Sequence, residues 1–184
     1  EYIHKRGISE ATAEKFELGY APASHLTLDF LRSRGFMMSE AIEYGVAGNG
    51  ESGGAYARFI ERLTFPIYTP SQKLVGFGGR TLSSHPAKYV NSPQTKYFNK
   101  SQLLYGYHLA KETIFKAKSI IITEGYLDVI MLHQAGFTQA VATLGTALTH
   151  EHLPLILRGD PEVIVAYDGD SAGVSAALKA SMLL

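Results

Sequence analysis

The last third of the chain alternates short apolar runs with amphipathic segments, and this alternation constrains the fold more than any other feature. Strands are expected at 120–123, 140–143 and 163–167, and helices at 126–135, at 151–157 and from about Ala172 onward. Strands that alternate with helices form parallel βαβ units. Continuous apolar runs indicate strands that are covered on both faces. We therefore predict a parallel α/β sheet over residues 119–184.

The preceding residues show a different pattern. Short helices are expected at 8–16 with Ser9 as N-cap, at 27–34 and at 39–44, because each ends at a glycine or follows a capping residue. Apolar positions of period two at 63–68 and 73–78, around a turn at Pro70-Ser71, predict a hairpin. A longer helix is expected at 102–118. This predicts an α+β unit over residues 1–118, followed by a second unit over residues 119–184.

Charge is distributed unevenly although the net charge is zero. Residues 1–118 hold fifteen Lys and Arg against ten Asp and Glu, whereas residues 119–184 hold two against seven. No acid occurs between Glu61 and Glu112. The basic residues of this stretch are Arg62, Lys73, Arg80, Lys88, Lys96, Lys100 and Lys111. Such a one-signed segment is typical of a surface that binds an anion.

Composition excludes several classes of protein. A chain with 46% hydrophobic and 18% charged residues is neither disordered nor fibrous. No apolar run approaches the roughly 20 residues that span a bilayer, so a soluble protein without a membrane partner is expected. Cysteine is absent, which excludes disulfides and thiolate zinc sites in these 184 residues and fits a reducing cytosol. The start at Glu1, without an apolar signal region, suggests a piece of a longer polypeptide.

Acidic residues follow two of the predicted parallel strands. Glu124 closes the first strand, Asp168 and Asp170 follow the third, and Asp128 lies one helical turn after Glu124. The carboxyl ends of such strands share one edge, where ligands bind. Two carboxylates about 5 Å apart repel by roughly 3 kcal/mol at an effective dielectric of 20. Mg²⁺ or Mn²⁺ would offset this repulsion and suits oxygen ligands.

The main alternative is that Asp168-Gly169-Asp170 is a turn whose second Asp caps the next helix. Alone, the motif supports both interpretations equally; Glu124 on another strand end favours metal binding. A calcium loop is excluded because residues 173–177 supply no carboxylate. His150 and His152 have a spacing that could bind a metal, but a solvated helix start is the favoured interpretation.

Aromatic residues are interleaved with the cations of the acid-free stretch. Phe65 and Phe77 alternate along the hairpin and are expected in the core. A different interpretation applies to the polar loop Lys88-Tyr89-Val90-Asn91-Ser92-Pro93. A loop interrupted by proline does not need this mixture of cationic, aromatic and polar residues for its own structure. Cations that follow a backbone and aromatics that stack on bases are typical of single-strand nucleic-acid binding.

Several motifs, in order, resemble one protein family. They are Arg62-Leu63-Thr64-Phe65-Pro66-Ile67, Gly76-Phe77-Gly78-Gly79-Arg80, Lys88-Tyr89-Val90-Asn91-Ser92-Pro93, Phe98-Asn99-Lys100, Leu104-Tyr105-Gly106, Glu124-Gly125-Tyr126-Leu127-Asp128, Leu144-Gly145-Thr146-Ala147 and Asp168-Gly169-Asp170-Ser171-Ala172-Gly173. The first five resemble the basic subdomain of bacterial DnaG-type primases, and the last three resemble the family's TOPRIM motifs. The resemblance covers essentially the whole chain and implies a basic α+β subdomain followed by a parallel-sheet, Rossmann-like TOPRIM subdomain.

The resemblance implies a DNA-directed RNA polymerase, a nucleotidyltransferase of the primosome, that makes short RNA primers on single-stranded DNA during replication. Its partners would be the DNA template, the RNA primer and ribonucleoside triphosphates. Glu124, Asp168 and Asp170 would hold Mg²⁺ or Mn²⁺, with two or more ions in the complete domain and no zinc in these residues. The catalytic group would further include Asp128 and Lys100. Residues implied to contact nucleic acid or nucleotide are Arg62, Arg80, Lys88, Tyr89, Asn91 and Lys100.

The chain differs from the family in extent. The family's zinc-binding module and the region that binds the replicative helicase are absent from these residues, and its TOPRIM region continues into another acidic motif beyond Leu184. Activity is therefore expected of the full-length enzyme, and the 184-residue fragment can be inactive. A bacterial, cytoplasmic and nucleoid-associated location is implied.

Two alternatives remain. One is a TOPRIM nuclease or topoisomerase, which shares the Glu and Asp-x-Asp pattern; the basic segment 62–100 favours a primase. The other is a non-catalytic module that binds single strands.

Overall fold

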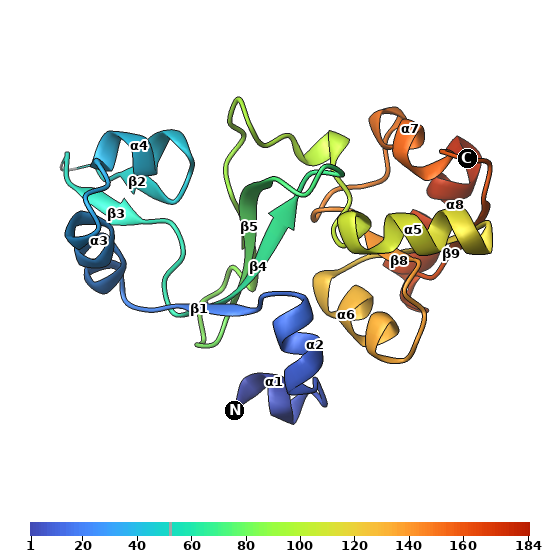
Figure 1. Ribbon diagram of the computed structural model, residues 1–184, viewed down its shortest axis with the longest axis horizontal. Coiled ribbons are helices and arrows are strands. Elements are labelled where there is room, and N and C mark those ends of the chain that lie inside the picture. Colours follow the sequence, from blue (N-terminus) through green and yellow to red (C-terminus); the bar gives the residue numbers. More distant parts are fainter. Residues whose placement is uncertain (52) are drawn as a thin grey trace.

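The computed structural model describes residues 1–51 and 53–184, and its elements form three groups along the long axis (Figure 1). A small lobe contains α3 (Ser24–Ser33), α4 (Met38–Glu43), β2 (Ala47–Asn49) and β3 (Ala55–Ala57). A central sheet contains β1 (Gly19–Ala21), β4 (Arg62–Tyr68), β5 (Leu74–Thr81) and β6 (Tyr89–Asn91). The third group contains α5 (Tyr107–Ala117), β7 (Ser119–Thr123), α6 (Tyr126–Gln134), β8 (Ala140–Ala142), η2 (His150–His152), α7 (Leu153–Ile156), β9 (Glu162–Val165) and α8 (Ser171–Leu183). Two short helices, α1 (Tyr2–Lys5) and α2 (Glu10–Lys15), begin the chain, and η1 (Lys100–Gln102) precedes α5.

The central sheet is antiparallel in the order β1-β4-β5-β6. The predicted hairpin is confirmed, since β4 pairs with β5 from Arg62 opposite Thr81 to Tyr68 opposite Leu74. Phe65 and Ile67 are completely buried because alternate side chains of a strand point to one face. The sheet thereby carries Arg80 on β5 and Lys88 directly before β6.

The predicted parallel sheet is also confirmed, with strands in the order β8-β7-β9. Its central strand β7 is apolar along Ile120–Ile122 and buried, as expected for a strand with a neighbour on each side and helices on its faces. Because all three strands run in the same direction, their carboxyl ends lie at one edge.

The helix predicted at 102–118 is too long, and the structure corrects it. Residues 103–105 are extended, and Tyr105 forms an isolated antiparallel bridge with Ala142 beside β8. Gly106 has a φ of +77°, and the helix α5 begins only after it. Buried apolar side chains suit both an extended segment and a helix face, so the sequence pattern could not separate the two.

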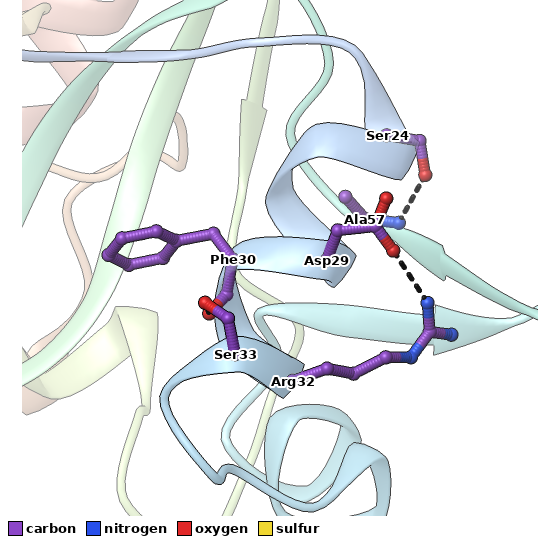
Figure 2. A network of polar contacts seen from close by, with 6 residues as sticks. All are labelled: Ser24, Asp29, Phe30, Arg32, Ser33 and Ala57. Carbon is purple, nitrogen blue, oxygen red and sulfur yellow. Dashed lines mark hydrogen bonds and ion pairs between the residues drawn. The ribbon is translucent and has the colours of Figure 1, made fainter.

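Polar contacts around α3 hold the elements of the small lobe to one another (Figure 2). Ser24 Oγ accepts a hydrogen bond from the Ala57 N–H at 2.8 Å, and Asp29 pairs with Arg32 at 3.0 Å. The next residue, Arg58, donates its N–H to Val46 O at 2.9 Å. These bonds fix the chain where it leaves β3 and thereby fix the start of the Arg58 side chain.

One apolar core crosses the predicted boundary at residue 118. It combines Phe65 and Phe98 from the first part with Tyr126, Val129 and Leu144 from the second. The division into residues 1–118 and 119–184 stays a prediction. Among the described residues, no helix has the length and apolar character needed to cross a membrane.

Candidate active site between an acidic sheet edge and a basic hairpin

The acidic edge is built where β7 and β9 end. Glu124 follows β7 directly, and its Oε1 accepts a hydrogen bond from the Asp168 N–H at 3.3 Å, which joins the two strand ends. Gly173 lies against both residues: a Cβ at this position would be 2.2 Å from Asp168 O and 2.9 Å from Glu124 Oε1. Any residue other than glycine at position 173 would therefore collide with the acidic edge.

Asp128 lies in the first turn of α6, beside the same edge. Its Oδ2 accepts a hydrogen bond from the Gly125 N–H at 3.0 Å. Burial raises the pKa of Asp128; the Gly125 bond opposes the shift, and the negative charge of Asp168 adds to it. The negative charge of Asp168 thus disfavours the charged form of Asp128.

Asp170 is placed differently from the other acids. Its Oδ1 accepts a hydrogen bond from the Gly173 N–H at 2.8 Å and caps α8, which confirms the helix-cap interpretation for this residue. In the described part of the chain, no three Asp, Glu or His side chains come close enough to surround one ion. The expected trio of Glu124, Asp168 and Asp170 is therefore not preassembled, because the cap bond holds Asp170 at the helix start.

A cavity of about 810 Å³ separates the acidic edge from a basic wall. Its charged lining residues are Arg6, Arg58, Arg80, Lys88, Lys100, Glu124, Asp128 and Asp168. None of these eight side chains belongs to an ion pair within residues 1–51 and 53–184. Five cations, here called the basic wall, and three carboxylates, here called the acidic wall, thus line one cavity.

Arg80, on β5, is held by aromatic rings. Its guanidinium carbon lies 4.5 Å from the ring centroid of Tyr2 and 5.9 Å from that of Tyr89. Its Nε is buried and has no hydrogen-bond partner among the described residues. Burial raises the pKa of Tyr89, and the neighbouring Arg80 opposes this shift. The stacking orients a cation that retains a free donor.

Arg62, which was expected to contact nucleic acid, is placed elsewhere. Its side chain is buried and donates hydrogen bonds to the carbonyl oxygens of Gly79 at 3.3 Å, Ala87 at 3.0 Å and Lys88 at 3.4 Å. The structure therefore corrects the expectation: the guanidinium holds the loop between β5 and β6, since the fork of five N–H donors suits several carbonyls at once.

Lys100 lines the cavity, and His152 fixes its backbone. His152 Nε2 lies 3.2 Å from Lys100 O, and its Nδ1 accepts from the Thr149 N–H at 3.1 Å. The ring is completely buried, and burial lowers its pKa. The expectation of a solvated helix start is therefore wrong for His152, because its ring faces the core.

Arg6 and Arg58 are the lining cations that the sequence did not reveal. Both lie outside the acid-free stretch, and neither belongs to a motif of charge or spacing that distinguishes it from a solvated arginine. They reach the cavity through tertiary contacts of their neighbours: the Tyr2 ring of α1 stacks on Arg80, and Phe59, next to Arg58, packs against Phe77 of β5.

The fold and this cavity define a class of protein: a Toprim sheet whose acidic edge faces a basic antiparallel sheet. A family model described as "DNA primase catalytic core, N-terminal domain" matches residues 1–111, and a model described as "Toprim domain" matches residues 118–184. The chain belongs to the DnaG-type DNA primase family.

Individual relatives agree with this assignment. The DNA primase of Helicobacter pylori is 55% identical over the whole chain, which covers 33% of that protein. The crystal structure of the Aquifex aeolicus primase zinc-binding and RNA polymerase domains has a TM-score of 0.92 at 36% identity, covering 100% of this chain and 45% of that one. The RNA polymerase domain of Mycobacterium tuberculosis DnaG, in complex with a double-stranded DNA oligomer with a 6-nucleotide overhang, has a TM-score of 0.87 at 39% identity, covering 97% and 59%. The chain spans about a third of the length of the curated relatives.

Toprim and primase proteins are generally metal-dependent. The residues at the acidic edge fit such an ion in their chemistry. The acidic edge supplies hard oxygen atoms from Glu124, Asp128 and Asp168. Among the described residues, none of these carboxylates is paired with a cation. The negative charge of Asp168 also disfavours the charged form of Asp128, and a bound cation would offset this. A divalent cation that keeps some of its waters needs only a few such ligands.

Proposed function

We propose that this chain is the catalytic core of a DNA primase, which joins ribonucleotides into a short RNA primer on a single-stranded DNA template. One observation carries the proposal: five cations and three carboxylates line one cavity, and none of them belongs to an ion pair among the described residues. Phosphoryl transfer depends on positioning and charge neutralisation more than on covalent help from the protein. This arrangement supplies both.

The acidic wall would hold the metal. Glu124 and Asp168 are the primary candidates, Asp128 supports them, and Asp170 can contribute the oxygen that does not cap α8. When bound, Mg²⁺ or Mn²⁺ supplies a Lewis acid and positive charge at the phosphates. The metal identity and the number of ions belong to the proposal.

The basic wall would hold the nucleic acid and the nucleotide. Arg80, Lys88 and Lys100 can donate to phosphate oxygens, and Arg6 and Arg58 extend this wall. Tyr89 is exposed on β6 beside Arg80 and offers a ring face to a base. A related structure, 37% identical over 97% of this chain, is described as the DnaG primase catalytic domain bound to ssDNA, which supports a single-stranded template as the ligand.

The remaining partners follow from the proposed reaction and from the family. They are the RNA primer, ribonucleoside triphosphates, and a replicative helicase that contacts a region outside these residues. A nucleoid-associated location in the bacterial cytoplasm belongs to the same proposal.

The deciding experiment measures template-dependent ribonucleotide incorporation. The protein assayed contains these 184 residues and is as long as the full-length relatives. We expect Asp168→Asn and Glu124→Gln each to lower the rate at least 100-fold, because each removes a charge from the metal-binding edge. Asp160→Asn is the matched control, since it makes the same charge change in a loop that does not line the cavity. Unchanged rates in both acid variants would refute the metal assignment.

Two further measurements separate the alternatives. Nicking of supercoiled DNA with Mg²⁺, in the absence of primer synthesis, would favour a Toprim nuclease or topoisomerase. Single-strand affinity should fall with salt at a log-log slope of roughly −2 to −4, at about −0.7 for each phosphate contacted. A slope near zero would remove the basic wall from the proposal, and binding without any catalysis would favour a non-catalytic module.

A further inference from the structure

A hydrogen-bonded pair connects the two walls of the cavity. The Tyr126 hydroxyl, on α6, donates to Asn91 Oδ1, on β6, at 2.5 Å. The same amide donates through Nδ2 to Leu144 O, after β8, at 2.7 Å. One side chain of the basic sheet is therefore tied to two segments of the Toprim sheet.

The Tyr126 ring is fixed as firmly as its hydroxyl. It is buried and stacks on Phe65 at 4.8 Å with an interplanar angle of 8°, and it meets Tyr105 edge-on at 4.7 Å. On β5, a Cβ at Gly78 would lie 2.4 Å from the ring. Only glycine leaves room for this tyrosine at position 78, and the ring lies against the strand that carries Arg80.

The position of the pair in the sequence links it to the site. Tyr126 is two residues after Glu124 and two residues before Asp128. Asn91 is two residues after Tyr89, which pairs with Arg80 across the β5–β6 register. A displacement of the Tyr126–Asn91 contact would therefore move the carboxylates relative to the cations.

Resting on the proposed function, we propose that Tyr126 and Asn91 are positioning residues for primer synthesis: their hydrogen bond sets the separation between the metal-binding carboxylates and the phosphate-binding cations. For Asn91 we propose this role in place of the direct nucleic-acid contact that the sequence suggested, since Oδ1 and Nδ2 of its amide each already have a partner within the protein. Phosphoryl transfer is sensitive to such a separation, because a misplacement of 1 Å can lower a rate about 100-fold.

The first test is kinetic and uses the longer protein defined above, which contains these 184 residues. We expect Tyr126→Phe to lower kcat for primer extension about tenfold. Asn91→Leu, which removes both bonds, should lower it further. The KM for ribonucleotides, the Kd for single-stranded DNA and the Kd for Mn²⁺ should each stay within about twofold, since the groups that bind them remain in place.

The matched control is Tyr107→Phe. Tyr107 is also buried, and its hydroxyl donates to Leu155 O at 3.2 Å, away from the charged walls of the cavity. It should lose similar stability and keep kcat. An unchanged kcat in Tyr126→Phe would overturn the proposal, and a rise in the DNA Kd of Asn91→Leu with normal kcat would return Asn91 to a direct contact.

The second test does not depend on activity. Residues 1–184 contain no cysteine, so two nitroxide labels can be introduced into this 184-residue chain at exposed positions, through Ser83→Cys after β5 and Lys179→Cys on α8. Double electron-electron resonance should give one narrow distance distribution, which broadens in Tyr126→Phe and not in Tyr107→Phe. If the unaltered protein makes no primers, the proposed function fails, and the distance distribution still decides the positioning role.

Discussion

Replacement of one glycine tests whether the acidic edge is as tightly built as the structure indicates. Gly173 lies in the first turn of α8, and an added Cβ would be 2.2 Å from the backbone oxygen of Asp168 and 2.9 Å from Glu124 Oε1. Contacts below 3.0 Å are essentially not seen, so Gly173→Ala requires a displacement of about 0.8 Å between α8 and Asp168. The obstructing atom at Asp168 belongs to the backbone and cannot rotate away.

The expected cost has two opposing parts. Overpacking of this kind destabilises by about 1–3 kcal/mol. Alanine in a helix gains up to about 1 kcal/mol over glycine. We therefore expect the free energy of unfolding to fall by about 1–2 kcal/mol. The affinity for Mn²⁺ should fall about tenfold or more, as is usual when the surroundings of metal ligands are disturbed.

Gly169→Ala is the matched control in the same motif. A Cβ at Gly169 meets nothing within 4 Å, so both stability and Mn²⁺ affinity should stay close to those of the unaltered chain. Urea unfolding gives the stability, and electron paramagnetic resonance of free Mn²⁺ gives the affinity. The reasoning is refuted if the two variants behave alike in both measurements.

Three further predictions follow from other contacts. Tyr2→Leu removes the ring at 4.5 Å from the Arg80 guanidinium and should weaken single-stranded DNA binding about two- to fivefold. A fluorescence anisotropy titration measures this, and an unchanged Kd would show that the stacking does not orient the cation. Burial lowers the pKa of His133 to about 4, so the stability that its neutral form contributes is complete above pH 6.5 and is lost as the pH falls toward 4. Urea unfolding should show a loss of up to roughly 3 kcal/mol over this range, and His133→Gln should abolish that loss. An identical pH dependence in both proteins would contradict this. Arg62→Met leaves the carbonyl oxygens of Gly79, Ala87 and Lys88 without this donor and should lower stability by about 2 kcal/mol in the same assay. Weaker DNA binding at unchanged stability would instead restore Arg62 as a nucleic-acid contact.

The sequence by itself determined the elements whose physics is local. The Ser9 cap, the 63–78 hairpin and the parallel strands were predictable because capping residues, period-two patterns and apolar runs act over a few residues. The common edge for Glu124 and Asp168 was also predictable, since parallel strands must end on the same side of their sheet. The charge asymmetry likewise indicated a basic part and an acidic part before any contact between them was known.

Tertiary structure decided how those parts meet. Arg6 and Arg58 reach the cavity only in the folded chain, where Tyr2 of α1 stacks on Arg80 and Phe59 packs against Phe77 of β5. Asn91 bonds to Tyr126 and Leu144 over 35 and 53 residues of chain. Nothing in the sequence distinguishes Arg62 and His152 from an exposed arginine and an exposed histidine, yet the fold buries both. The physical reason is that propensity and periodicity describe a residue's neighbours along the chain. Its hydrogen-bond partners and its exposure depend on segments whose approach is fixed only when the core packs.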